Sequence, residues 1–108
     1  MIHLAPLPGA PTYGGDLGAV IDAALLDLDA LVAGGLGAVM LENFNDIPFY
    51  PDRVPPETVA AMAVIGREVL RHAPTVALGI NVLRNDADAA LAVAAATGAA
   101  FIRVNVHT

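Results

Sequence analysis

Short apolar runs alternate with helix-forming segments along the chain, and this order constrains the fold more than any other feature. Runs typical of buried strands lie at residues 38–41, 76–80 and 101–106, with the end of a further strand at 2–4. Segments with helical spacing of apolar residues, or rich in alanine, lie between them at 16–32, 55–72 and 87–97. Strands that alternate with helices pair in parallel through right-handed crossovers, so the sequence predicts an α/β fold of order βαβαβαβ.

Residues typical of helix ends mark the limits of these segments. Asp16 and Asp86 stand where N-cap side chains are expected. Pro55-Pro56 opens the second helix, because proline is tolerated in a first turn. A glycine at position 34 or 35 ends the first helix, and Gly98 ends the third.

The composition excludes several classes of protein. The chain has no cysteine, which excludes a disulfide scaffold and a cysteine zinc site. Its net charge of −6 and scattered arginines disfavour nucleic acid as a partner. The uncharged stretch 89–102 is shorter than the roughly 20 residues that cross a bilayer, and no basic residue precedes Arg53 as a signal peptide would need. We therefore expect no membrane insertion and a cytoplasmic protein.

Polar residues gather where each predicted strand ends. They are His3 after the first strand, Glu42, Asn43 and Asp46 after the second, Asn81, Arg84, Asn85 and Asp86 after the third, and Arg103, Asn105 and His107 in the fourth. Ligands of parallel α/β folds bind beyond the carboxyl ends of the strands. This distribution predicts a site for a small-molecule ligand at that edge of the sheet.

The spacing of polar residues in the predicted fourth strand indicates which way their side chains face. Arg103, Asn105 and His107 are two residues apart and share one face of a strand, whereas Val104 and Val106 point toward the helices. An inward column of arginine, asparagine and histidine is costly unless it meets partners or a ligand. Glu42 is a candidate ion-pair partner for Arg103 or Arg84.

Structural roles compete with functional ones for several of these residues. Asp86 is expected to cap a helix first, and Asn43 and Asp46 are also typical of turns. His3 has the alternative of a partly buried histidine without chemistry. Glu42, Asp46, Asp86 and His107 include ligands suited to Mg²⁺ or Mn²⁺, but no spacing signature supports a metal site, so none is assigned and the cofactor stays unknown.

Four motifs along the chain are similar to those of a known family. They are residues 1–11 (MIHLAPLPGAP) with Tyr13, 41–50 (LENFNDIPFY), 81–86 (NVLRND) and 101–107 (FIRVNVH). In this order they resemble the BtpA family, also called the BtpA/SgcQ family, over essentially the whole chain.

The resemblance implies a TIM-like (β/α)8 barrel, which needs about 250 residues. Residues 1–108 are then a partial domain that holds strands one to four of the barrel, without its C-terminal half. The family's named member is implicated in photosystem I biogenesis in cyanobacteria. Similar proteins also occur in organisms without photosystems, in sugar-related contexts, so the resemblance implies the fold more firmly than the reaction.

Three hypotheses for function follow. In the first, the barrel binds a small polar or phosphorylated, sugar-like ligand, with Glu42 as acid/base, His107 or His3 as the second proton-transfer group, and Arg84 and Arg103 as anion anchors. Ligand-binding hydrogen bonds then come from Asn43, Asp46, Asn81, Asn85, Asp86 and Asn105. In the second, the protein is a non-catalytic factor for photosystem I biogenesis or membrane-complex stability. In the third, the 108-residue chain is an inactive fragment that self-associates through exposed sheet edges.

Overall fold

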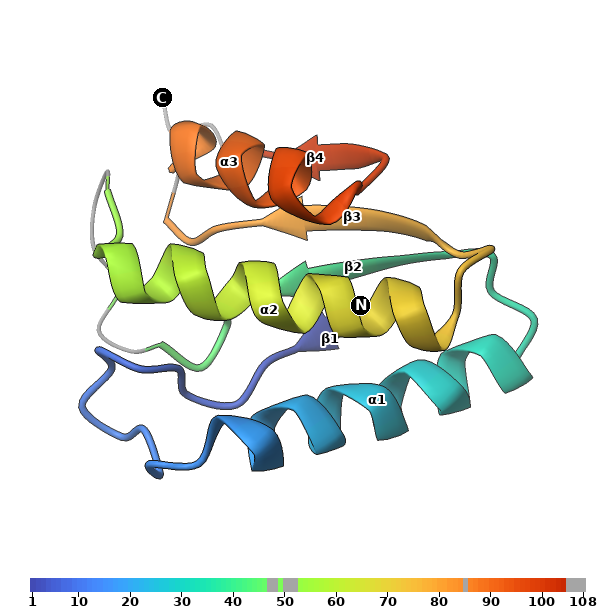
Figure 1. The fold of residues 1–108 in the computed structure, drawn as a ribbon, viewed down its shortest axis with the longest axis horizontal. Helices are drawn as coiled ribbons and strands as arrows, with labels where there is room; N and C mark the ends of the chain where they lie inside the picture. The colour runs from blue at the N-terminus through green and yellow to red at the C-terminus, as the bar shows by residue number, and fades with distance from the viewer. Residues whose placement is uncertain (47–48, 50–52, 85, 105–108) are drawn as a thin grey trace.

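The computed structural model describes residues 1–46, 49, 53–84 and 86–104 (Figure 1). Four strands and three helices alternate along this part of the chain. The strands are β1 (Ile2–His3), β2 (Ala38–Glu42), β3 (Ala77–Asn81) and β4 (Phe101–Arg103). The helices are α1 (Leu17–Ala33), α2 (Pro56–His72) and α3 (Ala87–Thr97). The predicted α/β class and the order βαβαβαβ are confirmed.

The four strands form one parallel sheet in the order β1-β2-β3-β4. Each strand pairs with the next strand in sequence, and a helix connects the two. The three helices lie together on the near side of the sheet in Figure 1. Ile2, Leu41 and Ile80 are neighbours in register and are fully buried under these helices. Because side chains alternate along a strand, the next residues of the three strands belong to the opposite, helix-free face.

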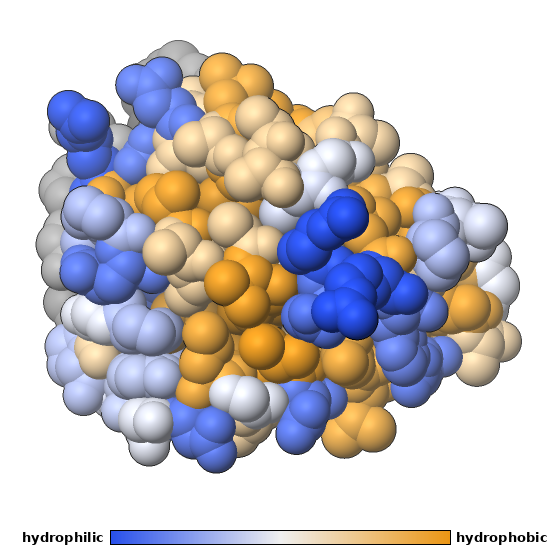
Figure 2. Space-filling model, in the orientation of Figure 1, coloured by the Kyte–Doolittle hydropathy of each residue, from blue (hydrophilic) through white to orange (hydrophobic). Residues whose placement is uncertain are grey.

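The core lies between the sheet and the helices. Its strand residues include Val39 and Leu78, and its helix residues come from the inner stripes of all three helices: Val20, Ala24, Leu28, Met62, Ile65, Val69, Ala90 and Val93. These positions recur at spacings of three and four, which brings them to one side of each helix. The helices also carry exposed apolar side chains, Leu26, Val64 and Leu91, and apolar surface is visible on this side of the molecule in Figure 2.

The helix ends follow the predicted caps. The Asp16 carboxylate accepts a hydrogen bond from the Ala19 amide at 3.2 Å, and Asp86 accepts one from Ala89 at 2.9 Å. Gly98 ends α3 with a φ of +82°, a left-handed conformation that glycine adopts without steric cost.

Strand β4 differs from its prediction. The sequence pattern extends it to residue 106, but in the described part of the chain it ends at Arg103. Val104, which we expected to face the helices, lies beyond the strand and is 38% exposed. An edge strand is paired on one side only, and β4 has β3 as its single neighbour in this sheet.

Two glycines permit close packing. A Cβ at Gly66 of α2 would lie 2.8 Å from Thr97 Cγ2 of α3, so the small residue lets the two helices approach. A Cβ at Gly79 of β3 would overlap the Phe101 ring, which crosses β3 on the helix-free face. This face therefore has an aromatic ring directly before the carboxyl end of β3.

Candidate functional site

A row of four polar residues crosses the helix-free face of the sheet at the carboxyl ends of the strands. His3 pairs in register with Glu42, Glu42 with Asn81, and Asn81 with Arg103. Each is the last residue of its strand. The parallel register therefore brings together an imidazole, a carboxylate, an amide and a guanidinium-bearing residue that are far apart in the sequence. We call these four residues the polar row.

Glu42 is the buried centre of the polar row. It is only 6% exposed, and its Oε2 accepts a hydrogen bond from Asn81 Nδ2 at 2.5 Å. Its other oxygen, Oε1, lies 3.5 Å from His3 Nε2. A buried carboxylate is costly to keep unless its oxygens are paired, and here both oxygens face a neighbour from the adjacent strand.

His3 closes the row on the β1 side. Its side chain is 44% exposed, and its ring stacks on Phe44 with centroids 4.4 Å apart and an interplanar angle of 14°. The stacking partner comes from the segment that follows β2, so the imidazole is held from the side as well as by Glu42. An oriented, accessible imidazole beside a carboxylate is suited to proton transfer.

An apolar layer lies two residues before the polar row, on the same face of the sheet. Met40, Gly79 and Phe101 are in register with one another on the same face, and the Phe101 ring covers Gly79. This layer borders Glu42 and Asn81 on the side toward the start of the strands. A low-polarity border strengthens the electrostatic interactions of the groups next to it.

Asn43 and Asp46 hold loops rather than point into the row. Asn43 accepts a hydrogen bond from the Leu83 amide at 2.6 Å and donates to the Leu83 carbonyl at 3.1 Å. The Asp46 carboxylate accepts one from the Leu7 amide at 2.8 Å. Burial raises the pKa of Asp46 above its ordinary value of 3.8, while the hydrogen bonds from Leu7 and Asn43 lower it in part. Both side chains thus tie the segment after β2 to the loops after β1 and β3.

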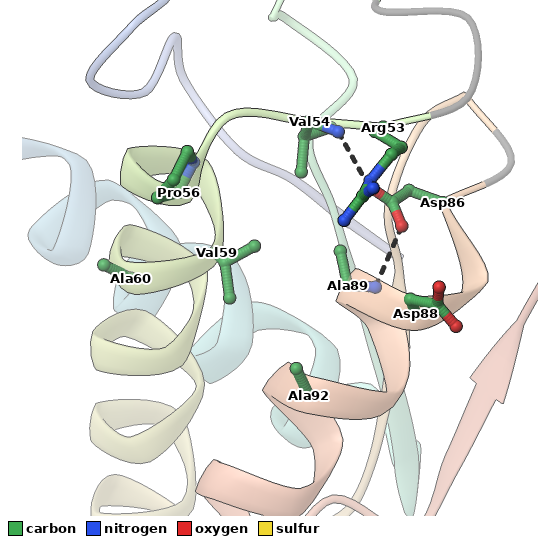
Figure 3. A pocket seen from close by; sticks show the side chains of 9 residues that line it. All are labelled: Arg53, Val54, Pro56, Val59, Ala60, Asp86, Asp88, Ala89 and Ala92. Carbon is green, nitrogen blue, oxygen red and sulfur yellow. Dashed lines mark hydrogen bonds between the residues drawn. The ribbon is translucent and has the colours of Figure 1, made fainter.

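Asp86 lies on the helix side of the molecule. Besides capping α3, its second oxygen accepts a hydrogen bond from the Val54 amide at 2.7 Å, as the dashed lines in Figure 3 show. It borders a cavity of about 440 Å³ between the first turns of α2 and α3, which Arg53 and Asp88 also line. Its predicted capping role is confirmed, and its bond to Val54 ties the loop before α2 to the start of α3.

The expected ion pair of Glu42 with an arginine is wrong. Among the described residues the partner of Glu42 is His3, and neither Arg84 nor Arg103 forms an ion pair with it. The register explains this, because Arg103 lies two strands from Glu42, about 10 Å across the sheet. Arg84 follows β3 and is exposed like Arg103, so both guanidinium groups are accessible from solvent.

The described carboxylates do not converge on a metal site. Within residues 1–46, 49, 53–84 and 86–104, no three histidine, aspartate or glutamate side chains lie together as metal ligands would. Glu42, Asp46 and Asp86, three of the four ligands considered from the sequence, have separate hydrogen-bond partners. The fourth, His107, and the predicted ligand-binding residues Asn85 and Asn105 lie outside the described residues.

Two contacts were not predicted from the sequence. Phe44 stacks on His3, and Asn45 donates a hydrogen bond from Nδ2 to the Leu4 carbonyl at 2.8 Å. Both residues belong to the motif 41–50 noted in the sequence, but their contacts have no local signal of their own. The partner of each residue lies about 40 positions away and became apparent only with the β1–β2 register.

The described helices were compared with the length and hydropathy that a membrane-spanning helix needs. In the described part of the chain, none is both long and apolar enough to span a bilayer.

Comparison with known proteins gives a family match over the whole chain. The sequence profile described as the BtpA family matches residues 1–108. An uncharacterized protein of Archaeoglobus fulgidus is 55% identical over 105 residues, which are 97% of this chain and 42% of that protein. The photosystem I biogenesis protein BtpA of Synechocystis is 49% identical over 108 residues, 100% of this chain and 37% of that protein.

The similarity extends to a further bacterial protein. The putative sgc region protein SgcQ of Escherichia coli is 47% identical over 106 residues, 95% of this chain and 38% of its own length. The chain therefore spans about two fifths of the length of these relatives. No solved structure matches it.

Proposed function

The chain belongs to the BtpA family, and from this membership and the observed sheet we propose that its four strands form the first half of a TIM-like (β/α)8 barrel. A barrel of this kind has parallel strands in sequential order with all helices outside, as this sheet has. The helix-free face with the polar row is then the inner face. Residues 1–108 are a partial domain, and the remaining strands come from a segment like the unmatched part of the relatives.

In this barrel the polar row binds a small polar ligand at the carboxyl ends of the strands. Glu42 is the acid/base, and His3 is a second proton-transfer group that Phe44 holds in place. His107, outside the described residues, is the alternative to His3. Arg84 and Arg103 are exposed beyond β3 and at the end of β4, and they serve as anchors for an anionic group, as in a phosphorylated ligand.

The remaining predicted residues divide by position. Asn81 lies in the row and orients Glu42, and Asn85 and Asn105 keep their predicted ligand-binding role. Asn43, Asp46 and Asp86 act on the ligand indirectly, because their side chains hold the loops that surround the row.

The single observation that carries this proposal is the burial of Glu42. Its carboxylate is 6% exposed with an amide and a half-exposed imidazole as neighbours, and within the described residues no arginine forms an ion pair with it. Buried carboxylates in purely structural roles are usually ion-paired or bind backbone amides, as Asp86 does here. A buried carboxylate beside an imidazole, which can exchange a proton, is suited to acid/base chemistry.

Thermal stabilisation by ligands tests the proposal. The full-length protein is screened with sugars, sugar phosphates, small carboxylates, amines and inorganic phosphate, alone and with Mg²⁺. We expect at least one compound to raise Tm in the wild type and at least tenfold weaker binding in Glu42→Gln, since a lost charged hydrogen bond costs about 1.5–3 kcal/mol. Glu68→Gln is the control, because Glu68 lies on α2 and pairs with Arg71 at the surface. Absence of any stabilising compound, or equal binding by Glu42→Gln, contradicts the proposal.

A second candidate is a non-catalytic role in photosystem I biogenesis. The observation that favours it is the name of the Synechocystis relative, which is 49% identical to this chain. The two candidates differ in their dependence on Glu42. If the matched segment of that relative is replaced by this chain, a non-catalytic role predicts that photosystem I levels are the same with Glu42→Gln. A loss of photosystem I specific to Glu42→Gln favours the ligand-binding role.

A further inference from the structure

Asn81 has a buried oxygen without a hydrogen-bond partner. The residue is 1% exposed, and within the described chain its Oδ1 is the one buried side-chain polar atom that no donor reaches. An unpaired buried acceptor costs about 1–3 kcal/mol, so such an atom in a native protein calls for an explanation. Asn43, also 1% exposed, uses both ends of its amide on Leu83, which shows that burial of an amide in this fold does not itself leave an atom unpaired.

The orientation of the Asn81 amide follows from its neighbour. Glu42 Oε2 accepts a hydrogen bond at 2.5 Å, and two facing oxygens would repel, so the NH₂ end must point to β2. The Oδ1 end is consequently directed away from Glu42. The next residue of the polar row on the other side is Arg103 of β4, which is exposed and leaves the amide oxygen without a bond.

The surroundings select the kind of group that can pair with this oxygen. A partner must be a donor, and it must be small, because the oxygen is buried between strand neighbours. Phosphate and carboxylate oxygens accept hydrogen bonds and carry negative charge, so both Asn81 Oδ1 and the Glu42 carboxylate disfavour them here. Hydroxyl and amino groups satisfy both conditions.

We propose that Asn81 is a specificity-determining residue whose Oδ1 accepts a hydrogen bond from a hydroxyl or amino group of the ligand. The proposal rests on the ligand-binding function proposed above and specifies which part of the ligand enters the row. The donor group lies on the β4 side of Asn81, away from Glu42, and any anionic group of the same ligand lies outside the row, at the exposed Arg84 and Arg103.

Matched probes test this directly. The full-length protein is titrated by calorimetry with glucose, glucosamine and the 2-, 3- and 6-deoxy glucoses, with the same series of pentoses, with the phosphate esters of these compounds, and with inorganic phosphate. We expect one hydroxyl or amino probe to bind about five- to tenfold more tightly than its deoxy analogue, since one hydrogen bond contributes about 1–1.5 kcal/mol. Comparison of the hydroxyl and amino members distinguishes the two donors.

Two variants test whether Asn81 causes the difference in affinity between a hydroxyl probe and its deoxy analogue. In Asn81→Leu we expect the hydroxyl probe and its deoxy analogue to bind within about twofold of each other, because the apolar side chain of similar size has no acceptor. Asn45→Leu is the matched control, since Asn45 bonds the Leu4 carbonyl outside the row, and there the discrimination should persist. Should Asn81→Leu fail to fold, the ¹³Cγ resonance of Asn81 in the wild type gives the same information, because it shifts when Oδ1 accepts a bond from the probe.

Several outcomes overturn the proposal. They are discrimination that persists in Asn81→Leu, a ¹³Cγ resonance that does not move on saturation, and inorganic phosphate binding that depends on Asn81. Equal weakening of anionic probes by Asn81→Leu and Arg103→Leu also overturns it, because the amide would then only position the guanidinium. If anions bind in a Glu42-dependent manner while no donor probe discriminates, the proposed function stands and this inference fails. If no probe binds at all, both fail.

Discussion

The buried carboxylate and amide side chains of the described residues divide into those that hold loops and those that belong to the polar row. Asn43, Asp46 and Asp86 bind backbone amides of segments far away in sequence. Glu42 and Asn81 bind each other, and an atom of Asn81 has no partner among the described residues. This difference separates structural from functional candidates more clearly than burial alone, because all five residues are less than 10% exposed.

Replacement of Asn43 tests the structural class. Asn43→Leu should lower the free energy of unfolding by about 2–4 kcal/mol, because it leaves both the amide and the carbonyl of Leu83 unpaired. Urea denaturation measures the loss. Asn45→Ala removes one partly buried bond and should cost less. Equal effects of the two substitutions would show that the reciprocal pair adds no stability.

Asp46 predicts a pH dependence. Its folded-state pKa is raised above 3.8 by burial, so the protonated form favours folding. The stability from this group is fully present below about pH 3.8 and is lost as pH rises through the raised folded-state pKa. Asp46→Asn keeps an acceptor for the Leu7 amide and removes the charge, so it should equal or exceed the wild type in stability at pH 7 and lose this advantage at low pH.

Urea denaturation of both proteins from pH 3.5 to 7 checks this sign. Asp46→Ala is the control, because it leaves the buried Leu7 amide unpaired and should destabilise at every pH by about 1–3 kcal/mol. A stability difference between Asp46→Asn and the wild type that grows in the wild type's favour with rising pH would contradict the assignment.

The sequence predicts candidate residues better than their roles. Glu42 and Asn81 were expected at strand ends and are there, and Asp86, expected after the third strand, caps α3. Whether a side chain faces the helix-free side or caps a helix depends on the register and on distant backbone amides, such as Val54 for Asp86. Those partners are set by tertiary structure, and for the same reason the expected pairing of Glu42 with an arginine was wrong.

At the scale of elements, helix boundaries follow local chemistry and strand ends do not. Helices begin after Asp16 and Asp86 and end before Gly98, as the sequence predicts. These boundaries are predictable because capping depends on local hydrogen bonds and local backbone conformation. The end of β4 was predicted at residue 106, three residues beyond Arg103. The alternation of apolar and polar residues continues to 106, but the end of a strand also depends on where its pairing with the neighbouring strand stops. The close approach of α2 and α3 at Gly66 was not predicted, because an isolated glycine has no specific local signal.

The close packing of α2 against α3 at Gly66 predicts that a larger residue there destabilises the protein. Gly66→Ala places a Cβ 2.8 Å from Thr97 Cγ2, and Thr97 is held by its hydroxyl bond to the Val93 carbonyl. We expect a net loss of about 1–3 kcal/mol from overpacking, although alanine is the better helix former. Thermal denaturation measures it, with Val64→Ala at an exposed position of α2 as control. Stabilisation by Gly66→Ala would show that the helices can separate without cost.

At the scale of the molecule, the sheet of the described chain has two free edges and one face without helices. β1 pairs only with β2 and β4 only with β3. Unpaired strand edges promote association between chains. The purified 108-residue chain should therefore self-associate in sedimentation experiments as its concentration rises. A single 11.0 kDa monomer at all concentrations would contradict this prediction.

Barrel closure should remove this association. A chimera in which this chain replaces the matching 105-residue segment of the Archaeoglobus fulgidus relative supplies the remaining 58% of that protein, since the match covers 42% of it. We expect the chimera to be monodisperse, because both edges then have partners. The sequence predicts the parallel sheet from its own alternation of elements, whereas the closed barrel is a proposal that rests on the family resemblance.

The crystal structure of this chimera most directly tests whether the sheet is part of a closed barrel with the polar row inside. We predict an eight-stranded closed barrel in which a fifth strand pairs with β4 and the last strand with β1. His3, Glu42, Asn81 and Arg103 then point toward the barrel axis at the carboxyl ends of the strands. A structure in which β4 stays an unpaired edge, or in which the polar row lies on the outer surface, would contradict it.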